Sequence, residues 1–165
     1  MTVVVRQART HDVAVIRHLV DTYSPERRLL SKATVTLFEA VPEFLVAEVD
    51  GTVVGCGALH VMWEDLAEVR TLAVDPNVRR QGVGSAILRA LIERSEQLGV
   101  PRMFCLTFET DFFGAHGFVE IDGAPVSHEV YEQLLQSYDE GVAEFLGLER
   151  VKPNTLGNTR MLREG

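Results

Sequence analysis

The sequence predicts an α/β fold, more closely an α+β arrangement in which helices flank a mixed β-sheet. Apolar, β-branched runs bounded by Gly, Pro and Asp alternate with segments of helical apolar spacing, in the order β-α-α-β-β-β-α-β-α-β. A second observation is the strand predicted at 68–74, which leads through a turn and a basic, glycine-containing loop into a helix at 87–97. The 165 residues show no repeat or linker, so we expect one domain over 1–165.

The N-terminal segments read as a strand at 3–6, a helix ending at Ser24-Pro25, and a second short helix within 27–40. Thr10 is the predicted N-cap of the first helix, because its hydroxyl can accept a hydrogen bond from the first helical turn. Apolar residues at helical spacing support that helix.

Two strands, 44–49 and 52–63, are predicted to form a hairpin. Asp50-Gly51 between them is a strong signal for a two-residue turn. Gly55 and Gly57 inside the second strand indicate a bulge or the close approach of another backbone element.

Alternating short segments follow the central helix. We expect a strand at 102–106, a short helix at 110–116 closed by Gly117, and a strand at 118–121. The segment 125–151 has helical apolar spacing, which fits core packing, a lid or an oligomer contact.

Composition and charge narrow the class of protein. A net charge of −8 argues against a nucleic-acid partner, which requires a basic face. We find no apolar stretch long enough to cross a membrane and no signal-peptide pattern, so a cytoplasmic protein is expected. The two cysteines, Cys56 and Cys105, and the histidines lack metal-ligand spacing, so no metal is expected, and Cys56 is interpreted as a buried structural thiol.

The loop 78–86 carries the strongest functional signal. Gly82 and Gly84 lack a Cβ, so backbone N–H groups can approach phosphate oxygens, and the following helix adds its unpaired donors and positive dipole end. Arg79 and Arg80 supply charge-assisted donors. On an acidic protein this local positive charge favours a small anionic ligand such as a pyrophosphate.

The Arg-x-x-Gly-x-Gly pattern of this loop resembles the coenzyme A loop of the GNAT family of N-acetyltransferases. Gly114-Ala115-His116-Gly117-Phe118 resembles a second landmark of that family, a short helix ending in Gly-Phe. The resemblance implies the GNAT fold, a mostly antiparallel sheet with splayed fourth and fifth strands. It also implies acetyl-CoA as cosubstrate.

More specific similarity points to bacterial N-acetylglutamate synthases. Gly55-Cys56-Gly57-Ala58-Leu59, Leu72-Ala73-Val74 and Asn158-Thr159-Arg160-Met161-Leu162 are similar to their acetyltransferase module, and the tail 125–158 to its short actinobacterial form. The resemblance implies acetylation of glutamate or glutamine, the first step of arginine biosynthesis. It allows a homodimer, and it does not decide between the two acceptors or indicate feedback by arginine.

The resemblance also assigns the donor side of the site. Leu72, Ala73 and Val74 would offer backbone groups to the pantetheine arm, and one of these amides would polarise the thioester carbonyl. The predicted acetyl-CoA-binding residues are Leu72, Ala73, Val74, Arg79, Arg80, Gln81, Gly82, Val83, Gly84 and Ser85.

Glu68 is the candidate general base, because the resemblance places it where one branch of the family carries a catalytic glutamate. Strand alternation puts Arg70 on the same face as Glu68. The carboxylate could then accept the ammonium proton of an amino acid while Arg70 attracts its carboxylate. Alternatively, Glu68 and Arg70 could simply pair with each other. The remaining candidates for the acceptor are Lys32 and Arg160 for carboxylates and Thr107 as a hydrogen-bond donor, although a structural role for Thr107 is favoured. Each cation could equally be a solvated surface charge.

The pattern departs from much of the family at Phe113, where many members carry a tyrosine that protonates the leaving thiolate. Tyr131 or Tyr138 could replace it, or helix dipoles and water could serve. Two alternatives to the leading function stay open. One is a GNAT enzyme for another amine, such as a protein N-terminus, a polyamine or a drug. The other is a non-catalytic acyl-CoA-binding module.

Overall fold

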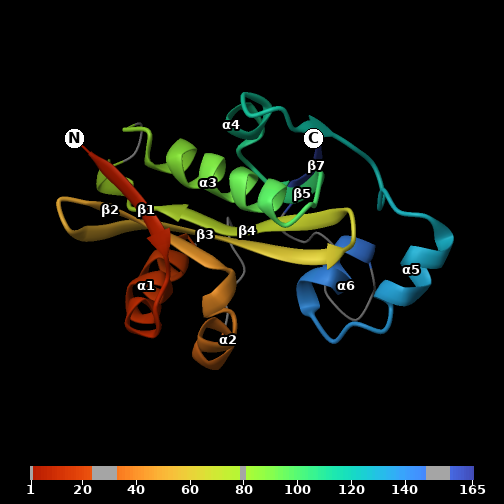
Figure 1. Ribbon diagram of the computed structural model, residues 1–165, viewed down its shortest axis with the longest axis horizontal. Coiled ribbons are helices and arrows are strands. Elements are labelled where there is room, and N and C mark those ends of the chain that lie inside the picture. The colour runs from red at the N-terminus through yellow and green to blue at the C-terminus, as the bar shows by residue number, and fades with distance from the viewer. Residues whose placement is uncertain (1, 24–32, 79–80, 148–156) are drawn as a thin grey trace. The chain divides into compact units, whose positions relative to one another are not determined.

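The computed structural model describes residues 2–23, 33–78, 81–147 and 157–165 (Figure 1). Its strands and helices, in chain order, are β1 (Val3–Gln7), α1 (Val13–Tyr23), α2 (Thr34–Glu39), β2 (Phe44–Val49), β3 (Thr52–Trp63), β4 (Leu66–Val74), α3 (Val83–Gln97), β5 (Arg102–Thr107), α4 (Thr110–Gly114), β6 (Val119–Glu120), α5 (His128–Leu134), α6 (Glu140–Leu146) and β7 (Thr159–Glu164). Short 3-10 turns lie at Thr10–Asp12, Val41–Glu43 and Pro76–Val78.

The strands form a seven-stranded mixed sheet with the hydrogen-bonded order β1-β2-β3-β4-β5-β7-β6. The pairs β1–β2, β2–β3, β5–β7 and β6–β7 are antiparallel, whereas β4–β5 is parallel. This confirms the predicted mixed, mostly antiparallel sheet. The chain divides into two compact units, 1–60 with 69–100 and 61–68 with 101–165, and one domain over 1–165 stays a prediction.

The first unit contains the predicted hairpin with the predicted ends. Asp50 (φ 52°) and Gly51 (φ 78°) both adopt left-handed backbone conformations, as a type I′ turn requires. The register then shifts, because Ala47 pairs with Gly55 while Glu48 pairs with Val53, which leaves Val54 as the extra residue of a bulge.

Helices cover both faces of the strands in this unit, with α1 and α2 on one side and α3 on the other (Figure 1). On the first side, buried side chains of α1, α2, β2, β3 and β4 form one core cluster that includes Ile16, Val20, Leu37, Cys56 and Ala73. On the α3 side, a Cβ on Gly57 would lie only 2.8 Å from Ile87 Cγ2. The bulge, one of the two alternatives predicted for these glycines, is therefore confirmed, and what approaches Gly57 closely is a side chain of α3.

Two predicted helix starts are wrong. Thr10 does not cap α1, because a 3-10 turn precedes the helix and the Asp12 carboxylate accepts the N–H of Arg9 at 2.7 Å. Arg6 fixes that carboxylate with two hydrogen bonds of 2.8 and 3.0 Å, which holds the 3-10 turn in front of the helix. Helix α3 begins at Val83, four residues before its predicted start, so Gly84 lies in its first turn.

In the second unit, β4 pairs with β5 from Leu66↔Arg102 to Glu68↔Phe104, and β7 lies between β5 and β6. The core on one sheet face contains Met62, Leu66, Phe104, Leu134, Val142, Phe145, Leu146 and Leu162. Helices α5 and α6 supply four of these side chains, so the described part of 125–151 packs as core.

Candidate active site

The N-terminus of α3 has backbone N–H groups that can donate hydrogen bonds to a ligand. Its first regular hydrogen bond runs from Ala86 N to Gly82 O at 3.0 Å, so the N–H groups of Val83 and Gly84 precede the helical ladder. Gly82 is the N-cap, with φ 82°, and no side chain in the described ranges caps it. An added Cβ at Gly82 would meet no described atom within 4 Å, which leaves room for a phosphate group.

Of the predicted acetyl-CoA residues, Gln81 to Ser85 lie at this helix start. Gln81 and Gly82 are exposed, whereas the Val83 side chain is buried and anchors the turn. Arg79 and Arg80 lie outside the described residues. A pyrophosphate on these backbone donors stays a prediction.

The end of β4 supplies the neighbouring backbone groups. Ala73 is buried in the core and Leu72 and Val74 are half-buried. Val74 O accepts a hydrogen bond from the Tyr23 hydroxyl at the end of α1, and Asp75 N donates to Val54 O of β3 at 2.8 Å. C=O and the following N–H point in opposite directions across a trans peptide, so Val74 O faces away from β3.

Thr71 in this segment has φ 54°, a left-handed conformation that is a genuine outlier for a β-branched residue. Sequence reasoning missed it, because Thr within an apolar run predicts an ordinary strand residue. Such strain persists only where surrounding structure enforces it, and it gathers at functional sites.

Glu68 and Arg160 come together in the second unit. Glu68 is 4% exposed and pairs in register with Phe104, so both side chains lie on the sheet face that α5 and α6 cover. The Arg160 guanidinium lies 5.0 Å from the centre of the Phe104 ring. Burial lowers the pKa of Arg160, and the negative charges of Glu68 and Glu144 partly oppose that shift.

Arg160 also binds backbone. Its Nε donates to Gly123 O at 2.8 Å and its Nη2 to Phe145 O, so the side chain connects β7 to α6 and to the loop before α5. These contacts hold the guanidinium in one orientation above Phe104. The solvated surface charge considered from the sequence therefore does not apply to Arg160.

The other acceptor candidates are less informative. The Thr107 hydroxyl accepts the Glu109 N–H at 2.8 Å, a local turn contact that supports the favoured structural role. Arg70 is half-buried in the first unit, and its shared face with Glu68 stays a prediction. Lys32 lies outside the described residues.

The aromatic residues considered for the leaving thiolate have different surroundings. Phe113 is buried and packs edge-to-face on Phe112 and Phe118, with ring centres 5.2 and 5.1 Å away. The Tyr131 hydroxyl lies 3.5 Å from Leu146 O, and Tyr138 is 98% exposed. Phe113 thus serves as a packing residue where a tyrosine would offer a proton.

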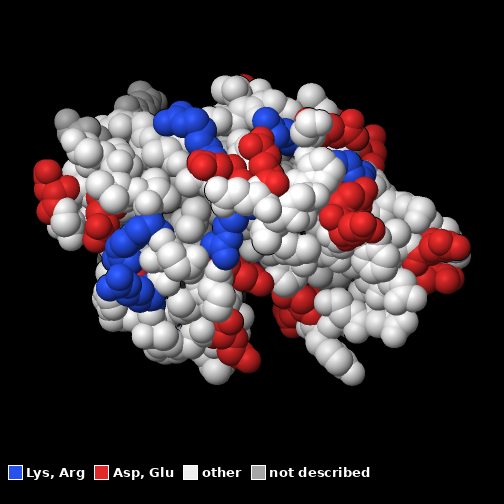
Figure 2. All heavy atoms as spheres, in the orientation of Figure 1, with Lys and Arg blue, Asp and Glu red and all other residues white. Residues whose placement is uncertain are grey.

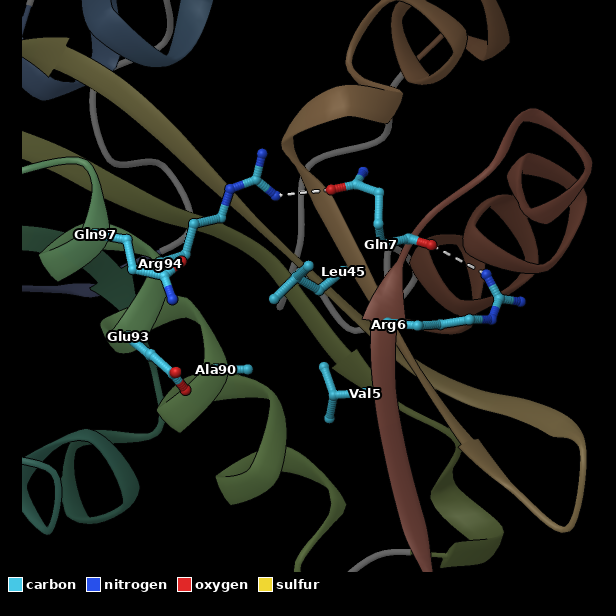
Figure 3. Close-up of a pocket in the computed structure, with 8 residues that line it drawn as sticks. All are labelled: Val5, Arg6, Gln7, Leu45, Ala90, Glu93, Arg94 and Gln97. Carbon is cyan, nitrogen blue, oxygen red and sulfur yellow. Dashed lines mark hydrogen bonds between the residues drawn. The ribbon is translucent and has the colours of Figure 1, made fainter.

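A separate hollow of about 360 Å³ lies in the first unit between β1, β2 and the C-terminal half of α3 (Figure 3). Three of its polar side chains, Arg6, Gln7 and Arg94, already have protein partners. Arg94 donates to Gln7 Oε1 at 3.0 Å and to Pro42 O at 2.7 Å, and Arg6 is held by Asp12. None of the predicted site residues lines this hollow.

Among the described residues, no group of three or more His, Cys, Asp and Glu side chains could hold a metal ion. In the same ranges, no helix has the length and apolar character needed to cross a membrane. On the face drawn in Figure 2, acidic side chains are widely spread and basic ones form small separate groups.

Comparison with known proteins identifies the family. Residues 13–123 match the acetyltransferase (GNAT) family. An amino-acid acetyltransferase of Mycobacterium tuberculosis is 57% identical over 162 residues, which cover 96% of this chain and 92% of that protein. The chain therefore belongs to the GNAT family of acetyltransferases, which confirms the predicted resemblance.

A more distant relative and a solved structure support the same family and fold. An amino-acid acetyltransferase of Neisseria meningitidis serogroup A is 32% identical over 116 residues, covering 69% of this chain and 27% of that longer protein. The crystal structure of Rv2747 from Mycobacterium tuberculosis in complex with CoA and NLQ superposes with a TM-score of 0.94 at 56% identity, over 98% of this chain and 99% of that one. The GNAT fold is thus confirmed along almost the whole chain.

Proposed function

We propose that this protein transfers the acetyl group of acetyl-CoA to the α-amino group of L-glutamate or L-glutamine. The observation that carries the proposal is the buried Glu68 beside Arg160 in the second unit, a base and a cation suited to an amino-acid zwitterion. The 57% identity to an amino-acid acetyltransferase over 96% of the chain supports the same class of acceptor.

The donor side lies in the first unit. The N–H groups at the start of α3 bind the pyrophosphate of acetyl-CoA, with Arg79 and Arg80 as additional charged donors. Backbone groups of Leu72, Ala73 and Val74 hold the pantetheine arm as an added strand. Leu72 and Val74 are half-buried, whereas Ala73 is buried.

The acceptor side uses Glu68 and Arg160. An amino acid is mostly an ammonium ion at neutral pH, so Glu68 accepts a proton from it, directly or through water. Arg160 attracts a carboxylate and orients the amine, and Arg70 and Lys32 are further candidates for a second carboxylate.

The chemical step forms one bond and breaks one. The neutral amine attacks the thioester carbonyl carbon, the N–C bond forms, and the C–S bond breaks as coenzyme A leaves. The attacking nitrogen loses one proton and the departing thiolate takes up one, so the products are an N-acetyl amino acid and free CoA. A backbone N–H of β4 stabilises the charge on the carbonyl oxygen in the tetrahedral transition state. With glutamate as acceptor, this is the first step of arginine biosynthesis, in the cytoplasm, by a monomer or homodimer.

The test is release of free thiol from acetyl-CoA with glutamate, glutamine and spermidine as separate acceptors. We expect turnover with glutamate or glutamine, and a loss of roughly 10²–10⁴-fold in kcat for Glu68→Gln, since it removes the base. Glu64→Gln is the matched control, because Glu64 is exposed in the turn before β4. Turnover with spermidine alone would indicate a different amine acceptor, and no turnover with any acceptor would favour an acyl-CoA-binding module.

A further inference from the structure

The strained peptide between Thr71 and Leu72 has a specific partner. Cys56, on the neighbouring strand β3, is fully buried, and its Sγ donates a hydrogen bond to Thr71 O at 3.4 Å. This contact satisfies the carbonyl that the left-handed conformation of Thr71 turns toward the core cluster. The thiol is therefore part of what holds the unusual backbone in place.

A second contact concerns the backbone of Ala73, further along β4. Burial raises the pKa of Cys56 to about 12, and the backbone of Ala73 partly offsets that shift. The thiol thus stays protonated and can donate.

The geometry of the 71–72 peptide gives the Leu72 amide the opposite direction. Described residues contain no cis peptide bond, and in a planar trans peptide the N–H is antiparallel to the preceding C=O. Since Thr71 O points at Cys56, Leu72 N–H points away from it. The hydrogen bond from Cys56 to Thr71 O therefore also fixes the direction of the Leu72 N–H on the opposite side of the peptide.

We propose that Cys56 is a positioning residue for acetyl transfer, which holds the 71–72 peptide so that Leu72 N–H can donate to the thioester oxygen. The inference rests on the proposed function for its catalytic part. Cys56 touches neither substrate and acts only through the backbone of β4. A fixed donor lowers the barrier because no reorganisation is needed when charge develops on the oxygen.

The kinetic test compares Cys56→Ala, Cys56→Ser and Val46→Ala. Val46 pairs with Cys56 in register and is equally buried in the same core cluster, so its truncation removes packing from the same place without touching β4. We expect kcat to fall roughly tenfold or more for Cys56→Ala, with little change in KM for acetyl-CoA, because the amide is misplaced only for the transition state. Cys56→Ser keeps a donor and should recover part of kcat.

The control separates positioning from stability. Val46→Ala should lower the melting temperature at least as much as Cys56→Ala while kcat stays near that of the wild type. Equal loss of kcat in both alanine variants, or no recovery in Cys56→Ser, would overturn the proposal.

A second measurement does not depend on turnover. The ¹³C chemical shift of the Thr71 carbonyl and the amide shift of Leu72 should change in Cys56→Ala and stay near the wild-type values in Val46→Ala. Unchanged shifts in Cys56→Ala would refute the anchoring itself. A wild-type protein that transfers no acetyl group, with the expected shift changes, would refute the proposed function and the catalytic role together but leave the anchoring established.

Discussion

Gly57→Ala tests directly whether the close packing of α3 on the strands of the first unit requires a glycine in β3. Gly57 lies in β3, and its missing Cβ lets the helix approach. An added Cβ would lie 2.8 Å from Ile87 Cγ2 and 3.1 Å from Leu91 Cδ1, both on α3. It would also lie 3.1 Å from Leu72 Cδ1 on β4. Actual Cβ atoms do not approach heavy atoms as closely as the first of these distances, so something must shift.

The loss of folding free energy depends on which atoms have to move. The nearest one belongs to a β-branched residue in a helix, where χ1 is confined to essentially one rotamer, so α3 itself has to move. Overpacking of this kind costs about 1–3 kcal/mol, while replacing Gly by Ala in a strand returns about 0.5–1 kcal/mol of backbone entropy. We expect a net loss of about 1–2 kcal/mol, or about 2–8 °C in Tm for a chain of this size.

The assay is thermal unfolding together with the KM for acetyl-CoA. The KM should rise several-fold, because the displaced helix carries the predicted pyrophosphate donors at its N-terminus. Gly114→Ala in α4 is the matched control, since its Cβ would meet nothing within 4 Å and should stabilise the protein by about 0.4–1 kcal/mol. A Gly57→Ala protein with a wild-type Tm and KM would refute the reasoning.

Three other predictions concern the charged and ionisable side chains. Arg160→Lys should raise the KM for the amino acid roughly tenfold, as measured by initial rates, because an ammonium cannot replace a planar guanidinium that binds two carbonyls and stacks on Phe104. Burial raises the pKa of both Cys56 and Cys105 above the ordinary value of 9.0, so above pH 9 the unfolded chain loses thiol protons that the folded chain keeps. Urea unfolding should therefore show stability falling with pH by about 1.4 kcal/mol per unit for each thiol, and Cys56→Ala should remove one such contribution. The Arg6 guanidinium holds the pKa of Asp12 below its ordinary 3.8, so the stability that Asp12 contributes is complete at neutral pH and is lost as the pH falls through the folded-state pKa. Asp12→Asn should cost about 1.5–3 kcal/mol at pH 7 and much less near pH 2, again measured in urea.

The features predicted correctly from sequence were those encoded by neighbouring residues. Asp50-Gly51 sets its own turn, so β2 and β3 have the predicted ends, and the glycines of β3 correctly indicated a bulge. The start of α1 depended instead on the 3-10 turn at Thr10–Asp12, in which Arg6 of β1 fixes the Asp12 carboxylate. Such a choice is decided by tertiary contacts and does not follow from the capping preference of Thr10 alone.

In the candidate site, too, local features could be predicted from sequence and contacts between distant residues could not. The glycine-containing segment that leads into α3 was predictable because its residues adjoin in sequence, although the helix itself begins four residues earlier than predicted. The role of Arg160 in holding Gly123 O and Phe145 O was not, since those partners lie far away along the chain. Thr71 gave no local signal either, because its left-handed backbone is maintained by Cys56 from the next strand.

The strand order also has a consequence for folding kinetics. Strands β2, β3 and β4 follow one another through short turns, so their pairing closes small loops and costs little chain entropy. Pairing of β7 with β5 instead closes one large loop, which contains the intervening residues 108–158. Contacts of high sequence separation form slowly. During refolding, amide protection from hydrogen exchange should therefore develop first in the β2–β4 meander and last in β7.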